Sequence, residues 1–219
     1  MRRFLILILS CLTVSLAASS CSDEPSSAPD VVFIGNSITA YWAKYHPDFF
    51  RDNNIAGRGI SGQTSGQIRG RFASDVVELR PKAVVIMAGI NDLAQNIGWV
   101  DPDGVFDNIR VMCMRAQAAG IVPVIASITP ADHIYWKPEL TGIPEGIRAL
   151  NDRLREYARS AGIDYVDYYS ALDTDGDGAI DDGLSDDGVH PLPDTYYIME
   201  EVVLPHLKPY LTTDINTDR

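Results

Sequence analysis

The sequence predicts a three-layer α/β/α domain with a central parallel sheet of about five strands. Two observations favour this fold class. Short apolar runs alternate along the chain with longer amphipathic stretches, as they do in βαβ units. Two of the runs, "KAVVIMAG" and "IVPVIASI", are continuously apolar, as is typical of strands that helices cover on both faces. Strands joined in this way run parallel.

The expected strands and helices follow each other along the chain. The strands are expected at 31–34, 55–57, 83–87, 122–127 and 165–168. The helices are expected at 40–52, 65–79, 105–119, 144–161 and 195–211. Gly120 and Gly162 stand where C-terminal helix caps belong. Pro123 needs a bulge or a position that requires no N–H. The pattern contains no internal repeat and no second domain.

The N-terminal segment is expected to lie outside this domain. Arg2 and Arg3 precede an apolar run that is too short to span a bilayer comfortably, so residues 1–20 are typical of a signal peptide. Small residues then lead to Cys21, which resembles a bacterial lipoprotein signal whose cysteine receives the lipid; a plain secretory signal is the alternative. Residues 21–30 are rich in Ser, Pro and acidic residues and are expected to form a flexible acidic tether. The folded domain is then 31–213, held outside the cytoplasm by a lipid in a bacterial membrane, with the outer membrane as our expectation.

The charge of the chain excludes several classes of partner. The formal net charge is -12, and removal of residues 1–20 takes away Arg2 and Arg3, which gives -12 - 2 = -14. Nucleic acids and anionic lipid surfaces need clustered Lys and Arg, so neither is expected as a partner. The expected contact with a membrane is therefore the lipid anchor only.

The cysteines exclude two kinds of site. Of three cysteines, Cys11 leaves with the signal peptide and Cys21 is the expected lipid site. Cys113 then remains alone, so neither an intramolecular disulfide nor a four-cysteine metal site is possible. Its helical spacing to neighbouring apolar residues predicts a core position.

Chemically capable residues follow the predicted strands. Ser37 lies in "GNSIT", Gly62 in "RGISGQTSGQ" and Asn91 in "MAGINDLAQN", and "LSDDGVHP" holds Asp187 and His190 before the last helix. Because the carboxyl ends of parallel strands form the functional edge of such a sheet, we expect these residues to lie together.

A serine hydroxyl is a weak nucleophile that needs a base within hydrogen-bond reach. His190 is the best candidate for this base. Asp187, three residues upstream, can hold the imidazole ring and stabilise its protonated form. Asp186 is the rival for this orienting role.

The four stretches, with Ser, Gly, Asn and His in this order, resemble the SGNH or GDSL-like hydrolase superfamily over essentially the whole domain. Their spacing is most similar to the platelet-activating-factor acetylhydrolase-like branch. The resemblance implies a flavodoxin-like fold and a serine esterase without a cofactor or metal, and it selects Asp187 as the acid. It also implies an oxyanion hole made of the Ser37 N–H, the Gly62 N–H and the Asn91 amide.

Two departures from known patterns are visible. The commonest first block of this superfamily has Asp before the serine, whereas this chain has Asn36. The chain also lacks the Gly-x-Ser-x-Gly sequence of the α/β-hydrolases, which use the same triad on another fold.

The expected substrate is a short acyl ester, acetyl above all, carried by a carbohydrate. The small size of the domain, the lack of a long apolar lid and the expected location in the cell envelope favour this choice. One alternative is a lipid acyl ester, as for a lysophospholipase or a platelet-activating-factor acetylhydrolase. The other is a non-catalytic lipoprotein that binds glycan in the same pocket.

Simpler structural roles compete with these functional ones. Ser37 is also a favoured helix N-cap residue, and Asn91 and Asp92 are typical of a capping turn. The remaining histidines lack an acid at useful spacing and are expected at the surface or in packing, with a position in the pocket wall as the alternative for His133, which lies in a loop after a strand. They are His46, His133 and His206.

Two loops carry further candidate features. "DHIYWKPEL" follows the fourth strand, and its Tyr135 and Trp136 fit either a substrate-stacking wall or packing. "DTDGDGAIDDGL" matches the opening of a calcium loop, but Leu184 stands at the twelfth position, where a bidentate acid is required. A polar loop without metal is therefore our expectation, with calcium as the alternative.

Overall fold

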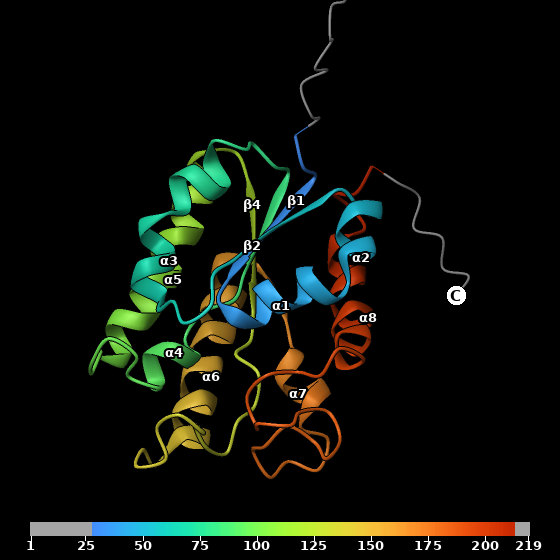
Figure 1. Ribbon diagram of the computed structural model, residues 1–219. Coiled ribbons are helices and arrows are strands. Elements are labelled where there is room, and N and C mark those ends of the chain that lie inside the picture. Colours follow the sequence, from blue (N-terminus) through green and yellow to red (C-terminus); the bar gives the residue numbers. More distant parts are fainter. Residues whose placement is uncertain (1–27, 213–219) are drawn as a thin grey trace, which may run out of the picture.

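The computed structural model describes residues 28–212, and it confirms the predicted fold class. Helices lie on both sides of one parallel sheet (Figure 1). The strands follow the order β2 (Ile55–Gly59), β1 (Val31–Gly35), β3 (Ala83–Ile86), β4 (Val122–Ala126) and β5 (Asp164–Val166) across the sheet. The predicted signal peptide and Cys21 lie outside the described residues. Within 28–212, no helix is both long and apolar enough to cross a membrane.

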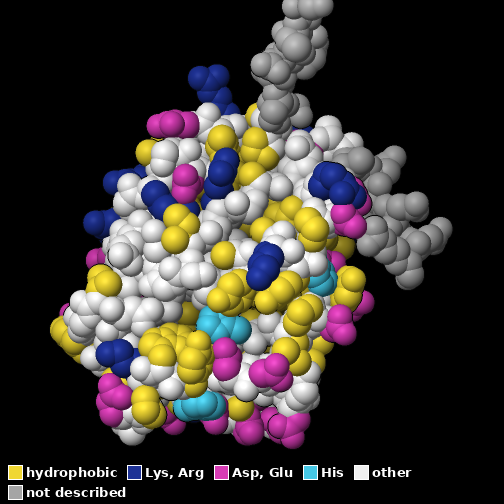
Figure 2. Space-filling model, viewed as in Figure 1, with side chains coloured by type: hydrophobic (Ala, Val, Ile, Leu, Met, Phe, Trp, Pro, Cys, Tyr) yellow, Lys and Arg dark blue, Asp and Glu magenta, His cyan; other side chains and the backbone are white. Residues whose placement is uncertain are grey.

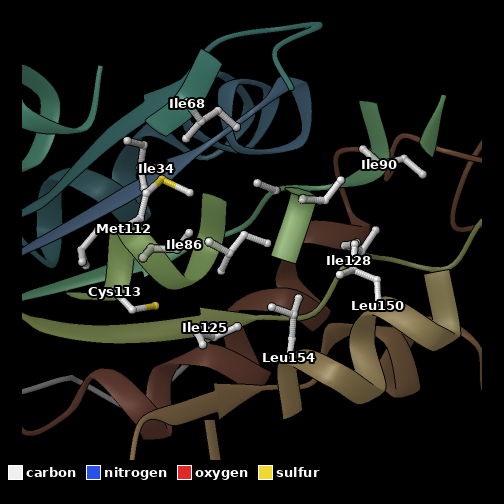
Figure 3. Close-up of a cluster of buried hydrophobic side chains, with 14 of the residues drawn as sticks. Ile34, Ile68, Ile86, Ile90, Met112, Cys113, Ile125, Ile128, Leu150 and Leu154 are labelled. Atoms are coloured by element: carbon white, nitrogen blue, oxygen red, sulfur yellow. The ribbon is translucent and has the colours of Figure 1, made fainter. Parts of the chain in front are cut away.

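One hydrophobic core lies on the face of the sheet to which Val32 and Ile34 point. Side chains of a strand alternate between the two faces, so the neighbours of these residues point the other way. Figure 3 shows this core, in which Ile86 of the sheet lies among Met112, Cys113 and other apolar side chains. The predicted core position of Cys113 is confirmed. This face is covered by α3 (Ser65–Gly70), η1 (Ala73–Val77), α5 (Pro102–Ala118) and α6 (Ile143–Ala161).

A second core fills the opposite face and is rich in aromatic rings. Trp42 packs edge-on against Phe33 of β1 at 5.3 Å between ring centroids and stacks on Phe49 at 5.6 Å. These rings hold the helix that follows β1 against the sheet. The helices on this face are α1 (Ser37–Tyr45), α2 (Pro47–Asp52), α7 (Tyr168–Leu172) and α8 (Thr195–Leu207).

The predicted helix at 40–52 is two helices in the structure. α1 ends before His46 and α2 starts at Pro47, because the residue before a proline is disfavoured in the helical conformation. The helix predicted at 65–79 is likewise divided into α3 and the π-helical turn η1. The strand predicted at 165–168 ends earlier, because the side chain of Asp167 accepts the N–H of Ser170 and caps α7.

Pro123 is accommodated without a bulge. The N–H of Val122 points to β3, where it donates to the carbonyl of Lys82 at 2.9 Å, so the nitrogen of Pro123 faces the other neighbour. On that side the pairing with β5 begins only at Val124. No hydrogen bond is therefore lost.

The folded domain begins at Asp30, one residue before the predicted start at Val31. Asp30, which the sequence analysis assigned to the tether, is buried. Its carboxylate forms an ion pair with Lys82 at 2.8 Å and accepts the N–H of Thr212 at 2.9 Å. Burial raises the pKa of Asp30, but these partners outweigh it, and the pKa lies below its ordinary value. Asp30 thus belongs to the folded domain and ties its two ends together.

Candidate active site

Ser37 is the first residue of α1, and Asn36 alone separates it from the end of β1. The Asn36 side chain accepts the N–H of Ile38 at 3.2 Å, so Asn36 is the N-cap of the helix. The alternative that Ser37 merely caps α1 is therefore wrong. Gly35 allows this tight turn, since a Cβ there would lie 2.2 Å from the hydroxyl oxygen of Thr39.

Ser37, His190 and Asp187 form a chain of hydrogen bonds. The Ser37 Oγ lies 2.8 Å from His190 Nε2, and His190 Nδ1 lies 2.8 Å from Asp187 Oδ2. Asp186, the rival orienter, does not touch the ring in the described structure; the expected acid lies at hydrogen-bond distance instead. Ser37 is 6 % exposed, so the nucleophile is buried, whereas the side chains of His190 and Asp187 are 15 % and 31 % exposed.

The Asp187 carboxylate is held by its own loop. Its Oδ1 accepts the backbone N–H groups of Val189 at 2.9 Å and His190 at 2.7 Å. Burial raises the pKa of Asp187, but the hydrogen bonds from His190 and Val189 outweigh it, so the pKa lies below its ordinary value. The carboxylate is therefore ionised at neutral pH and suited to hold a protonated imidazole.

Two helices that lie far apart in sequence keep Ser37 and His190 together. The hydroxyl of Tyr196 in α8 donates to the carbonyl of Ile38 in α1 at 3.0 Å. The Glu200 carboxylate accepts Trp42 Nε1 at 3.2 Å and lies 2.6 Å from His46 Nδ1. These contacts fix α8, and with it the loop that carries His190, against α1.

The histidines that sequence spacing left without an acid all have one in the structure. His46 pairs with Glu200, and His206 lies 2.8 Å from Asp164. His133 pairs with its neighbour Asp132 at 2.6 Å. The sequence missed the first two pairs because their acids come from other elements, and none of the three joins the Ser37 chain.

Gly62 and Asn91 lie in adjacent loops at the same edge of the sheet. Gly62 follows β2 and has φ of +77°, a conformation that favours glycine. Asn91 lies in α4 (Ile90–Leu93), a short helix that the sequence did not predict, directly after β3. Its Nδ2 donates to the carbonyl of Gln63 at 2.9 Å, so it reaches the residue next to Gly62.

Asp92 caps a different helix from the one that contains it. Its carboxylate accepts the N–H of Ser65, the first residue of α3, at 2.8 Å and the Ser65 hydroxyl at 2.7 Å. Burial raises the pKa of Asp92, and the hydrogen bonds from Ser65 offset only part of this rise. The capping role expected for Asp92 is thus confirmed, but it joins the loop after β3 to the loop after β2.

Arg71 is a site-forming residue that sequence reasoning missed. Its guanidinium donates to the carbonyls of Gly35 at 2.7 Å and Arg58 at 2.9 Å, and to the Gln63 side chain at 2.6 Å. Asp75 balances its charge at 2.5 Å. One side chain therefore clamps the ends of β1 and β2. No motif marks such an arginine in the sequence, because its partners come from separate elements.

Aromatic rings surround the His190 imidazole. Trp136 stacks on it with centroids 6.1 Å apart, and Tyr41 and Tyr135 lie at 5.3 and 6.3 Å. Of the two roles weighed for the aromatic loop, packing is observed for Trp136, and substrate stacking stays a prediction for Tyr135. Trp136 is partly buried against the core, whereas Tyr135 is 52 % exposed.

A pocket of about 230 Å³ opens beside His190. Tyrosines and the Asp186 carboxylate form much of its wall. The lining residues are Tyr41, Tyr45, Tyr135, Asp186, Asp187, His190, Pro191, Leu192 and Pro193.

Three acids of the predicted polar loop also come together. Carboxylate oxygens of Asp173, Asp175 and Asp177 lie within 4.8 Å of one another. Asp173 already accepts the backbone N–H groups of Gly176 at 2.9 Å and Gly178 at 3.1 Å. Leu184 supplies no ligand at the twelfth position, so the loop stays one bidentate acid short of the EF-hand pattern.

At the carboxyl edge of the parallel sheet, a serine is hydrogen-bonded to a histidine, which is hydrogen-bonded to an aspartate. This is the arrangement of the serine hydrolases. The family model of the GDSL-like lipase/acylhydrolase family matches residues 33–198. The chain belongs to this family, and it is an ester hydrolase.

Known proteins agree with this assignment. The crystal structure of a GDSL-like lipase from Bacteroides thetaiotaomicron is 41 % identical, with a TM-score of 0.80, over 82 % of this chain and 87 % of that chain. An uncharacterized lipoprotein of Bacillus subtilis is 25 % identical over 86 % of this chain and 88 % of its own length. A catalytic mutant of an acetylxylan esterase from Geobacillus stearothermophilus shares the fold, with 18 % identity and a TM-score of 0.65, over 83 % of this chain and 94 % of that chain.

Proposed function

We propose that this protein is a serine esterase that removes short acyl groups, acetyl above all, from carbohydrates. The observation that carries the proposal is the continuous hydrogen-bond chain from the Ser37 Oγ through His190 to the Asp187 carboxylate. Such a chain supplies an activated nucleophile, a base and an orienting acid.

In the proposed first step, the Ser37 Oγ attacks the ester carbonyl carbon while His190 Nε2 takes the hydroxyl proton. The carbonyl electron pair moves to the oxygen. His190 then returns the proton to the departing alcohol oxygen, and an acyl-serine remains. Water attacks this ester with His190 again as the base, which releases the carboxylic acid and restores Ser37.

The proposed oxyanion donors are the N–H groups of Ser37 and Gly62 and the side-chain amide of Asn91. The first N–H groups of a helix have no partner within the helix. Asn36 takes the N–H of Ile38 and thereby leaves the N–H of Ser37 for substrate. Asn91 lies one residue from Gly62 through its bond to Gln63, which supports a shared role.

The pocket beside His190 supports a sugar as the alcohol part of the substrate. Tyrosine rings stack on the apolar faces of sugars, and a carboxylate such as Asp186 accepts hydroxyl groups. Because His190 protonates the leaving alcohol, a pocket lined by His190 is suited to hold that alcohol. The shared fold with an acetylxylan esterase is compatible with this substrate class.

The charge around the pocket favours a substrate without negative charge. The segment 173–194 contains eight aspartates and neither Lys nor Arg. Figure 2 shows acidic side chains along the lower border of the molecule, where Figure 1 places this segment between α7 and α8. Anionic headgroups would be repelled there, which disfavours anionic phospholipids as substrates, although not zwitterionic ones.

A panel of esters tests the substrate. We expect kcat/KM to fall by at least about tenfold from 4-nitrophenyl acetate to 4-nitrophenyl octanoate, and acetylated xylo-oligosaccharides to be deacetylated. Tyr135→Ala should raise KM for the oligosaccharide about 3- to 10-fold, and more than it raises KM for 4-nitrophenyl acetate. Tyr197→Ala serves as a control, since Tyr197 is similarly exposed, at 54 %, and does not line the pocket.

Other results would replace this substrate. A preference for octanoate or for lysophospholipid favours a lipid acyl ester as the substrate. Glycan binding without deacetylation would support the non-catalytic reading of the pocket and remove the sugar ester.

We also propose that a lipid on Cys21 anchors the protein outside the cytoplasm, in the outer membrane. The N-terminal pattern and the lipoprotein name of the Bacillus subtilis relative support the anchor. Cells that express the full chain should incorporate labelled palmitate, and Cys21→Ala should abolish the label. Label that persists in Cys21→Ala would remove the anchor site, and fractionation of labelled cells tests the outer membrane.

A further inference from the structure

Asn96 joins three loops of the candidate active site. It lies just after α4, five residues beyond Asn91, and its backbone N–H donates to the Asn91 carbonyl at 3.1 Å. The chain turns back here because Gln95 adopts φ of +52°, which non-glycine residues rarely do. The turn places the half-buried Asn96 side chain between its neighbours.

All three polar contacts of this side chain reach residues of the site. Its Nδ2 donates to the Asn91 Oδ1 at 3.0 Å and to the Gly62 carbonyl at 3.2 Å. Its Oδ1 accepts the indole N–H of Trp136 at 2.9 Å. The loops after β2, β3 and β4 are thus linked through one amide.

The contact with Asn91 decides which way the Asn91 amide faces. With its Oδ1 turned to the Asn96 donor, Asn91 must turn its Nδ2 to the carbonyl of Gln63. If the Asn91 amide were reversed, its oxygen would face the Gln63 carbonyl oxygen and its NH₂ group would face the NH₂ group of Asn96, and both hydrogen bonds would be lost. An NH₂ group has two hydrogens, and the described residues offer this one a single acceptor. The second N–H therefore stays available for a substrate oxygen.

We propose that Asn96 is a positioning residue that orients the Asn91 amide for oxyanion stabilisation. This role rests on the proposed function, because it acts through one of the proposed oxyanion donors. The bond to the Gly62 carbonyl holds the Gly62–Gln63 peptide and so fixes the neighbouring loop, without touching the Gly62 N–H. Asn96 also accepts a hydrogen bond from Trp136, and Trp136 stacks on His190. Asn96 is thereby connected to the aromatic rings around the His190 imidazole as well.

Asn96→Asp keeps the shape and the acceptor for Trp136 but loses both donated hydrogen bonds and adds a negative charge. Asn96→Leu, which is similar in size and uncharged, loses the same donors, so a comparable loss in both variants assigns the effect to the donors and not to the charge. We expect kcat for 4-nitrophenyl acetate to fall about 10- to 100-fold, with KM changed by less than about threefold. Trp136→Phe tests the route through the aromatic wall, since it removes the indole N–H and the second ring but keeps one ring near His190; it should lower kcat less than Asn96→Asp does. Asn53→Asp is the matched control, because it makes the same change at a half-buried asparagine whose Nδ2 donates to the Phe49 carbonyl at 2.8 Å, outside the site. It should change kcat by less than about twofold.

Two patterns of loss would overturn the proposal. One is a loss in Trp136→Phe as large as the loss in Asn96→Asp, which would mean that Asn96 acts through the aromatic wall. The other is a loss caused by Asn96→Asp that is as large in the Asn91→Ala background as in the wild type. Because Asn96 is inferred to act mainly through Asn91, Asn96→Asp should cost less than about threefold when introduced into Asn91→Ala.

Independent measurements separate this role from folding and from the esterase mechanism. Thermal unfolding should show that Asn96→Asp is still fully folded at the assay temperature, even with a lower midpoint. If Ser37→Ala retained full activity, the proposed mechanism would fail whatever the outcome for Asn96. If Ser37→Ala lost activity but the Asn96 variants were as active as the wild type, the positioning role of Asn96 would be disproved and the esterase mechanism would stand.

Discussion

Ser37→Ala is expected to lower kcat for 4-nitrophenyl acetate by at least about 1000-fold, because no other group in the chain of hydrogen bonds can form the acyl intermediate. The side chain is small, so its loss should leave the fold intact. Circular dichroism and thermal unfolding check this point, and initial rates with the purified domain measure the loss.

The control for this variant is Ser61→Ala. Ser61 is an exposed serine of the neighbouring loop, and no hydrogen bond links it to His190. It should retain activity close to that of the wild type. Activity that survives Ser37→Ala would disprove the nucleophile and, with it, the proposed mechanism.

Asp187→Asn should lower kcat about 100- to 10,000-fold, because a neutral amide does not stabilise the protonated imidazole and favours the wrong tautomer. Asp182→Asn, an exposed aspartate of the same segment, is the matched control and should change kcat by less than about twofold. Equal losses in the two variants would point to a general effect of loop charge instead.

The same variant carries a pH prediction. The folded pKa of Asp187 lies below the ordinary 3.8, so its ionised form stabilises the folded state above that pH. The contribution is lost as the pH falls through the folded pKa. Urea unfolding should show Asp187→Asn less stable than the wild type at neutral pH, with a smaller difference near pH 3. A difference that does not change with pH contradicts this linkage.

The layers of the fold and the residues of the candidate site were predictable from local sequence. Continuous apolar runs mark the buried strands that Ser37 and Asn91 follow, whereas Gly62 follows the more exposed β2. The division of the predicted 40–52 helix has a local cause that is visible in the sequence, because Pro47 disfavours the helical conformation at His46.

The supporting contacts were not predictable in the same way. Arg71 reaches a carbonyl 36 residues away, and Asn96 reaches a carbonyl 34 residues away. His46 finds Glu200 across 154 residues. Such pairs depend on how the helices dock on the sheet, and a single sequence carries no periodicity that reports it. The core aromatic rings were visible as apolar residues, but their docking of α1 was not.

The buried thiol of Cys113 has a practical consequence. Burial raises its pKa to about 12, so at neutral pH it is a poor target for maleimides and other electrophiles. It is the free cysteine of residues 28–212. Spectroscopic labels can therefore be attached to cysteines introduced at the surface of the domain, without first removing a native one.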